Sequence, residues 1–237
     1  MRQNSIENIK KAMVHIILIS TSAILVFPFL WMFTGAFKND VEVLKMPPSL
    51  LPSKFNLDNF REISKLFPVE RFLMNSVFVA VITTLLQILF CAMAAFVFAK
   101  MKFKGREILF TAFLITMMIP SQLTMITLYK IFVDMNLQDS YLGLILPGTF
   151  NVLGIFLMRQ HIKTISDSLV EAAIVDGASY FRVFFQIILP LCKPALATVG
   201  ILAFMSSWNS FLWPLIIISS TKLATLPLGL SKLQGRW

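Results

Sequence analysis

The chain has 237 residues, of which 57% are hydrophobic and only 14% are charged. Soluble domains carry about 25% charged residues, so this composition excludes an ordinary soluble protein and is typical of an integral membrane protein. The net charge of +9 does not indicate a nucleic-acid partner, because the cations form short clusters beside apolar runs, as the orientation of membrane spans requires.

Five apolar runs are long enough to cross a membrane, since a spanning helix needs about 20 residues. They predict an all-α, polytopic helical bundle that forms a single transmembrane domain over the whole chain. The second run is long enough to tilt, and the fourth holds Pro147 and Gly148, which predict a kink. The expected spans cover residues 12–33, 72–99, 108–128, 142–158 and 195–219.

The short polar stretch between the second and third runs sets the expected orientation. Residues 100–107 contain four cations, and short loops rich in lysine and arginine stay in the cytoplasm. The N-terminus is then cytoplasmic and the protein lies in the cell membrane. Residues 35–71 form an outer loop, whose prolines prevent one continuous helix, and residues 159–194 form a second cytoplasmic loop.

The spans contain essentially no acidic or basic side chains, although ion-coupled transporters usually need such groups inside the membrane. The chain also lacks a G-x-x-x-x-G-K-[ST] phosphate loop, so it cannot bind ATP by that route. Cys91 and Cys192 fit neither a metal site nor a disulfide framework. We expect no catalytic residues and no metal site, and any energy for uphill transport must come from another subunit.

Two short helices are predicted within the second cytoplasmic loop. Ser168, followed three residues later by a glutamate, fits a capping box and predicts a helix that begins at about Leu169. Gly177 can take the left-handed conformation that ends a helix. Ser179 can cap a second helix, which should stop before Pro190.

The two predicted helices differ in character. The first has the small side chains of Ala172 and Ala173, which let another protein approach closely, and acidic tips at Glu171 and Asp176. The second is apolar over most of its surface and should pack under the spans. An ordinary interfacial pair of amphipathic helices explains the pattern equally well on physical grounds.

The run EAAIVDGASYFRVFFQIILP at residues 171–190, named here the EAA segment, resembles the EAA motif of bacterial ABC importer permeases. These are the inner-membrane components of binding-protein-dependent transport systems. The resemblance implies the type I permease fold and a coupling helix that docks into a groove of an ATPase subunit. The coupling residues that it implies are Glu171, Ala172, Ala173, Asp176, Gly177, Ile187, Leu189 and Pro190.

The run WNSFLWPL at residues 208–215, followed by TLP at residues 225–227, resembles the smaller permease of the maltose and glycerol-phosphate type. This resemblance implies transport of a carbohydrate. It implies as partners a second permease subunit, two ATPase subunits that bind ATP and Mg, and an extracellular or periplasmic solute-binding protein in a bacterial cell membrane. The family normally has a sixth span, and the hydropathy pattern leads us to expect none after the fifth apolar run of this chain.

The solute class remains open, because importers of glycerol-phosphate, peptides and amino acids share the EAA motif. A truncated membrane scaffold that transports nothing is a further alternative. Polar and aromatic side chains within the spans are candidates for the substrate path, since sugars bind through hydrogen bonds and aromatic faces. Interhelical hydrogen bonds and anchoring at the membrane interface explain the same residues. The candidates are Asn75, Gln87, Gln122, Asn151, Trp208, Asn209 and Trp213.

Overall fold

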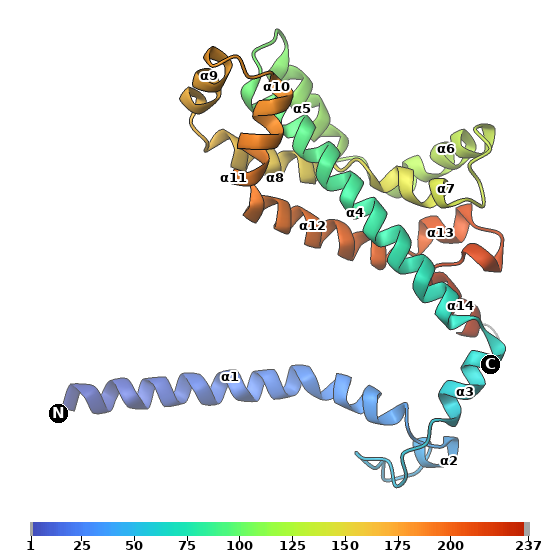
Figure 1. The fold of residues 1–237 in the computed structure, drawn as a ribbon. Coiled ribbons are helices and arrows are strands. Elements are labelled where there is room, and N and C mark those ends of the chain that lie inside the picture. The colour runs from blue at the N-terminus through green and yellow to red at the C-terminus, as the bar shows by residue number, and fades with distance from the viewer. Residues whose placement is uncertain (1, 235–237) are drawn as a thin grey trace. The chain divides into compact units, whose positions relative to one another are not determined.

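The structure, a computed structural model, describes residues 2–234 and divides into two compact units, Met1–Pro68 and Val69–Trp237. Every regular element among residues 2–234 is a helix or a helical turn, so the predicted all-α class is confirmed (Figure 1). Two helical segments, Lys10–Gly35 and Val69–Lys100, are each long and apolar enough to cross a membrane. Within the described residues the number rises to at most five when each bent pair of helices counts as one span.

The first unit is a long apolar helix followed by a folded loop. The ring of Phe37 contacts those of Phe55 and Phe60 at centroid distances of 5.5 and 5.6 Å, and these contacts hold the loop against the end of the helix. Lys38 is buried and its ammonium lies 4.8 Å from the centre of the Trp31 ring. The unit contains α1 (Arg2–Gly35), α2 (Asp40–Val43) and α3 (Asp58–Leu66).

The second unit is built around α4 (Val69–Lys100), which is one unbroken helix as the second apolar run predicts (Figure 1). Helices α8 and α12 pack along it. The remaining elements are α5 (Arg106–Thr116), α6 (Ser121–Asp134), α7 (Tyr141–Ile145), η1 (Leu146–Gly148), α8 (Val152–Lys163), α9 (Asp167–Val175), α10 (Tyr180–Val183), η2 (Phe184–Ile188), α11 (Leu189–Leu191), α12 (Lys193–Trp208), α13 (Leu212–Ile217), η3 (Thr221–Leu223) and α14 (Leu226–Gln234).

Three of the predicted spans are bent or divided, and a bend was predicted for only one of them. The run at 108–128 forms α5 and α6, which meet at 98° beside Pro120, a residue that cannot donate the hydrogen bond a continuous helix needs. The run at 142–158 bends by 44° after Pro147, as its proline and glycine predict. The run at 195–219 is divided into α12 and the separate short helix α13.

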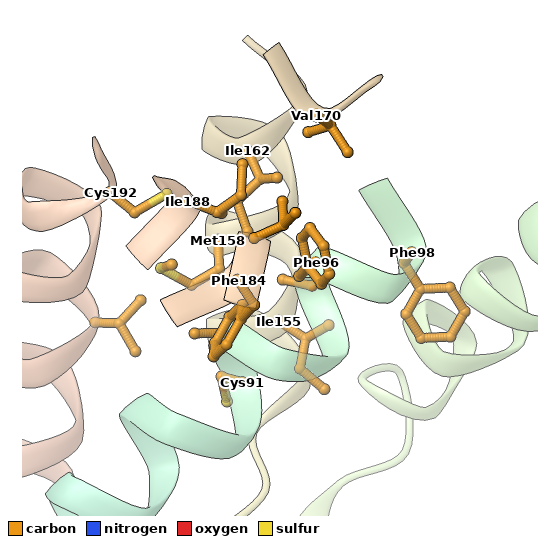
Figure 2. Packing of buried hydrophobic residues seen from close by; sticks show 14 of the residues in the cluster. Cys91, Phe96, Phe98, Ile155, Met158, Ile162, Val170, Phe184, Ile188 and Cys192 are labelled. Carbon is orange, nitrogen blue, oxygen red and sulfur yellow. The ribbon is translucent and has the colours of Figure 1, made fainter. Parts of the chain in front are cut away.

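Small residues allow the three central helices to approach closely. A Cβ added to Gly154 of α8 would lie 3.0 Å from Cys91 Sγ of α4 and 3.4 Å from a methyl carbon of Val199 of α12. Close backbone approach through small residues is the usual mode of helix packing in membranes. Figure 2 shows the buried side chains around this contact, which include Cys192, a residue of the predicted second cytoplasmic loop.

Helix α14, which no predicted span covers, packs on the beginning of α4. Gly229 faces the ring of Phe72 so closely that an added Cβ would lie 2.1 Å from a ring carbon. The Ser76 hydroxyl accepts a hydrogen bond from the Leu226 amide at 2.7 Å. The first and last helices of this unit therefore hold each other in place.

Candidate functional site

The first helix of the predicted pair begins two residues earlier than the sequence suggests. The cap is Ser166, whose extended backbone and hydroxyl meet the requirements of an N-cap, and it accepts a hydrogen bond from the Ser168 amide at 3.3 Å. Helix α9 therefore starts at Asp167. The predicted capping box is wrong, because Ser168 lies inside the first turn and Glu171 points instead toward Lys102, with 3.8 Å between carboxylate and ammonium.

The predicted helix end at Gly177, named here the glycine elbow, is confirmed. Gly177 has φ +86°, and the amides of Gly177 and Ala178 bond the carbonyls of Ile174 and Ala173 at 3.0 and 2.9 Å. This pattern is a Schellman motif, which satisfies the last carbonyls of a helix. Ser179 then caps the next helix by accepting a hydrogen bond from the amide of residue 182 at 3.3 Å, as predicted.

The second helix does not stop before Pro190, so that prediction is wrong. Helix α10 continues through the π-turn η2 into α11, where Pro190 occupies the first turn. The wider π-turn comes directly before the proline, where the Leu189 amide bonds the Phe184 carbonyl, and Pro190 lies at the start of α11, a position in which proline is common. Val183, Phe184 and Ile188 are buried in the core cluster, whereas Phe181 stays exposed.

A buried lysine anchors the start of α9 to the end of α4. The ammonium of Lys100 donates hydrogen bonds to the carboxylate of Asp167 at 2.6 Å and to the Ile165 carbonyl, and its side chain is buried. The hydrogen bond from Lys100 lowers the pKa of Asp167 below its ordinary value. Val170, one turn further along α9, is buried in the core cluster. The sequence identifies Lys100 only as an orienting charge.

A buried arginine joins three helices next to this anchor. The Arg159 guanidinium of α8 donates to the Phe98 carbonyl of α4 at 3.0 Å and to the Glu107 carboxylate of α5 at 2.5 Å. The same guanidinium lies 3.8 Å from the centre of the Phe110 ring. Sequence reasoning missed this role, because nothing in the pattern separates Arg159 from the cations of an exposed loop.

Helix α9 has one anchored face and one exposed face. Val170 and Ala173 lie against the core, whereas Glu171, Ala172 and Val175 are exposed. Of the other implied coupling residues, Asp176, Gly177 and Pro190 are exposed, and Ile187 and Leu189 are half-buried. The structure thus fixes the position of α9 while leaving a surface of small and acidic side chains open.

A second feature is a cavity of about 560 Å³ between α4, α6, η1 and α13. Four of the predicted path residues line it: Gln87, Gln122, Asn209 and Trp213. The indole N–H of Trp213 donates to the Gly143 carbonyl at 2.8 Å, which fixes the ring at the cavity wall.

The other path candidates have structural partners away from the cavity lining. Asn75 donates to the carbonyls of Lys222 and Ala224, both at 2.9 Å, and accepts from the Tyr141 hydroxyl at 2.8 Å. Two further candidates lie at helix ends: Asn151 caps α8 through the Gly154 amide at 3.0 Å, and the Trp208 ring stacks on Phe204.

The bundle of bent apolar helices, with an exposed helix in one loop and a polar cavity between its spans, has the architecture of a membrane transport permease. Residues 87–234 match the family described as "Binding-protein-dependent transport system inner membrane component". The chain belongs to this family, the permeases of ABC importers, which is not itself catalytic. It is therefore a membrane protein with the type I importer permease fold.

Two curated relatives and one solved structure illustrate the similarity. The arabinooligosaccharides transport system permease protein AraQ of Bacillus subtilis (strain 168) is 36% identical over 215 residues, which cover 90% of this chain and 76% of the relative. The sn-glycerol-3-phosphate transport system permease protein UgpE of Brucella abortus (strain 2308) is 34% identical, with coverages of 92% and 80%. A crystal structure of a bacterial ABC transporter involved in the import of the acidic polysaccharide alginate matches with a TM-score of 0.84 and 26% identity over 95% of this chain and 80% of that one.

Proposed function

We propose that this protein is one of two permease subunits of an ATP-driven importer that takes up a carbohydrate from an extracellular binding protein. The names of its relatives support the substrate class, since they include an arabino-oligosaccharide permease and a transporter of a polysaccharide. The polar cavity between the helices supports a path for a hydroxyl-rich solute.

The coupling of transport to ATP rests on one observation, the two faces of α9. Its exposed face carries small side chains that can fit a groove of an ATPase subunit, with Val175 as an apolar tip. Its other face is held through Val170 and Asp167 to the core and to α4. Because α9 is anchored to the central helix, a displacement imposed on it by the ATPase reaches α4, α8 and α12.

The energy for transport would come from ATP bound by partner subunits. The chain has no phosphate loop, so two separate ATPase subunits would bind ATP and Mg, and this chain would bind no cofactor of its own. The exposed face of α9 would lie in the cytoplasm, together with the N-terminus and the basic residues 100–107. The second permease subunit would complete the path across the membrane.

Val175→Glu tests the docking of α9. Val175 is 85% exposed, and a carboxylate placed at this apolar tip would be desolvated by the groove of the ATPase. We expect the amount of ATPase subunit that co-purifies with the permease to fall about tenfold. Val41→Glu is the matched control, because Val41 is 84% exposed and belongs to the first unit. Equal loss in both variants, or none in Val175→Glu, would remove the docking role.

A further inference from the structure

A second cavity, of about 270 Å³, lies between the end of α4 and the first turns of α9, and is named here the basic cavity. Its lining comes from segments far apart in the sequence: the end of α4, the basic stretch at residues 100–107, the end of α8, and α9. The charged residues that line it are four cations and two carboxylates: Lys100, Lys102, Arg106, Lys163, Asp167 and Glu171.

The carboxylates of the basic cavity do not neutralise its cations. Asp167 pairs with the buried ammonium of Lys100 at 2.6 Å, and this pair anchors α9. Glu171 lies 3.8 Å from Lys102, but both side chains are mostly exposed, and exposed ion pairs contribute little. Because the cations outnumber the carboxylates, the field of the cavity attracts an anion.

Three of the cations are accessible to a ligand. The Lys102 side chain is 88% exposed, Lys163 is exposed, and Arg106 is partly exposed. Hydrogen bonds from Arg106 to the Glu107 carboxylate and the Met101 carbonyl, both at 3.2 Å, hold its guanidinium at the cavity wall. Lys163 forms no hydrogen bond or ion pair within residues 2–234. A phosphate group offers the charged acceptor oxygens that such donors bind most strongly.

An apolar surface adjoins the same cations. Lys102 and Arg106 also line a shallow hollow whose lining includes Phe103 and Ile108, and Ile108 is 77% exposed. Within the described residues, α5 buries only Phe110. A ligand with a charged head and apolar chains meets both the cavity and this surface, whereas a soluble anion meets the cavity alone.

The basic cavity lies where a membrane span ends. Helix α4 is long and apolar enough to cross the membrane, and Lys100 is its last residue. The phosphates of phospholipids lie at the depth where a span leaves the hydrocarbon. Basic pockets at the cytoplasmic ends of membrane helices hold anionic lipid headgroups.

We propose that the basic cavity and the adjoining surface of α5 bind an anionic phospholipid. Lys102, Arg106 and Lys163 hold its phosphate, and its acyl chains lie against Phe103 and Ile108. A zwitterionic lipid binds less well, because its own ammonium group is repelled by these cations. The inference does not depend on which solute the importer carries, and it places the headgroup next to α9.

The test is photo-crosslinking of lipid to the assembled importer, purified with its second permease and ATPase subunits in phosphatidylcholine nanodiscs. The probes are phosphatidylglycerol and phosphatidylcholine, each with a diazirine near the start of one acyl chain and present at the same mole fraction. Mass spectrometry measures the crosslinks to residues 101–109. We expect phosphatidylglycerol to give about tenfold more crosslinks than phosphatidylcholine. Equal yields from the two lipids overturn the proposal.

A competition separates a lipid headgroup from free phosphate. We expect a large excess of inorganic phosphate to lower the phosphatidylglycerol crosslinks no more than sodium chloride of equal ionic strength, because phosphate makes no contact with the apolar surface of α5. A clearly larger loss with phosphate would show that the site takes the soluble anion, and would overturn the assignment to a lipid.

Variants separate a built site from general surface charge. Lys102→Gln and Lys163→Gln should each lower the phosphatidylglycerol crosslinks about fivefold. Lys104→Gln is the matched control, because Lys104 is an exposed residue of the same basic stretch but lines neither hollow, and its yield should stay close to that of the parent. All three positions are exposed, so the fold is not at risk. An equal loss in all three variants, or no loss in Lys102→Gln and Lys163→Gln, overturns the proposal.

Discussion

At the scale of single residues, the buried cations Lys100 and Arg159 hold the helices around the EAA segment. Each gives its hydrogen bonds to a backbone carbonyl and to a carboxylate on another element. A buried charge is stable only when such partners surround it, so removing the partners or the cation leaves uncompensated polar groups.

Arg159→Met is therefore expected to destabilise the protein. The substitution keeps most of the apolar volume over the Phe110 ring but removes the hydrogen bonds to Phe98 and Glu107, and we expect a loss of about 2 kcal/mol. The measurement is the midpoint of thermal unfolding of the purified protein in detergent. Arg182→Met is the matched control, because Arg182 is exposed and within residues 2–234 it bonds only the side chain of Gln186 and the cap of its own helix. Equal midpoints for the two variants would contradict the role of Arg159.

The lowered pKa of Asp167 predicts how the anchor of α9 responds to pH. The Lys100 hydrogen bond favours the carboxylate in the folded state, so the stabilisation is complete above the ordinary pKa of 3.8 and disappears as the pH falls through the lower pKa of the folded state. We expect hydrogen exchange of the α9 amides, compared at each pH with Asp167→Asn, to show protection at pH 6 that decreases once the pH falls below 3.8. A protection difference that does not change with pH would contradict the prediction.

At the scale of elements, the elbow between α9 and α10 decides where the exposed face of α9 ends. The left-handed φ of +86° at Gly177 costs a residue with a Cβ about 1 kcal/mol, although no atom lies within 4 Å of the position. Strain of the backbone, and not a clash, is therefore what a substitution introduces.

Gly177→Ala should loosen the last turn of α9 by about 1 kcal/mol. We expect faster hydrogen exchange at the amides of Gly177 and Ala178, which close the Schellman motif, with little change in the global unfolding midpoint. Gly35→Ala is the control, because Gly35 has no left-handed φ and no atom within 4 Å of an added Cβ. Unchanged exchange at the elbow in Gly177→Ala would show that the motif does not limit the opening of the helix.

At the scale of the whole molecule, the proposed orientation places residues 100–107 and the EAA segment on the cytoplasmic side. Cys91 and Cys192 are both buried, so the parent protein provides an unlabelled background for cysteine mapping. Lys54 and Lys104 are exposed, one in the predicted outer loop and one in the basic stretch.

In spheroplasts with an intact cell membrane, a membrane-impermeant maleimide should label Lys54→Cys and should not label Lys104→Cys. After permeabilisation both should react, because the positive-inside rule places the basic stretch in the cytoplasm. Labelling of Lys104→Cys before permeabilisation would reverse the orientation and would move α9 away from any cytoplasmic ATPase.

The sequence by itself determined the membrane class, the helical fold, the long central helix and the glycine elbow. These depend on local properties: the length of an apolar run, the residues that can cap a helix and the one residue that accepts a left-handed φ without strain. The conformational preferences of Gly177 and Ser179 do not depend on tertiary contacts, so the pattern alone predicts their roles.

Only the tertiary structure decided that Ser166 and not Ser168 caps α9, how the third and fifth apolar runs are divided, and which polar residues face a cavity. Gln122 and Asn151 look alike in the sequence, yet one lines the cavity and the other caps a helix. Arg159 and Lys100 look like loop cations, yet both are buried. The physical reason is the same in each case, because burial and pairing depend on contacts between helices that are far apart in the sequence, and hydropathy and spacing do not record those contacts.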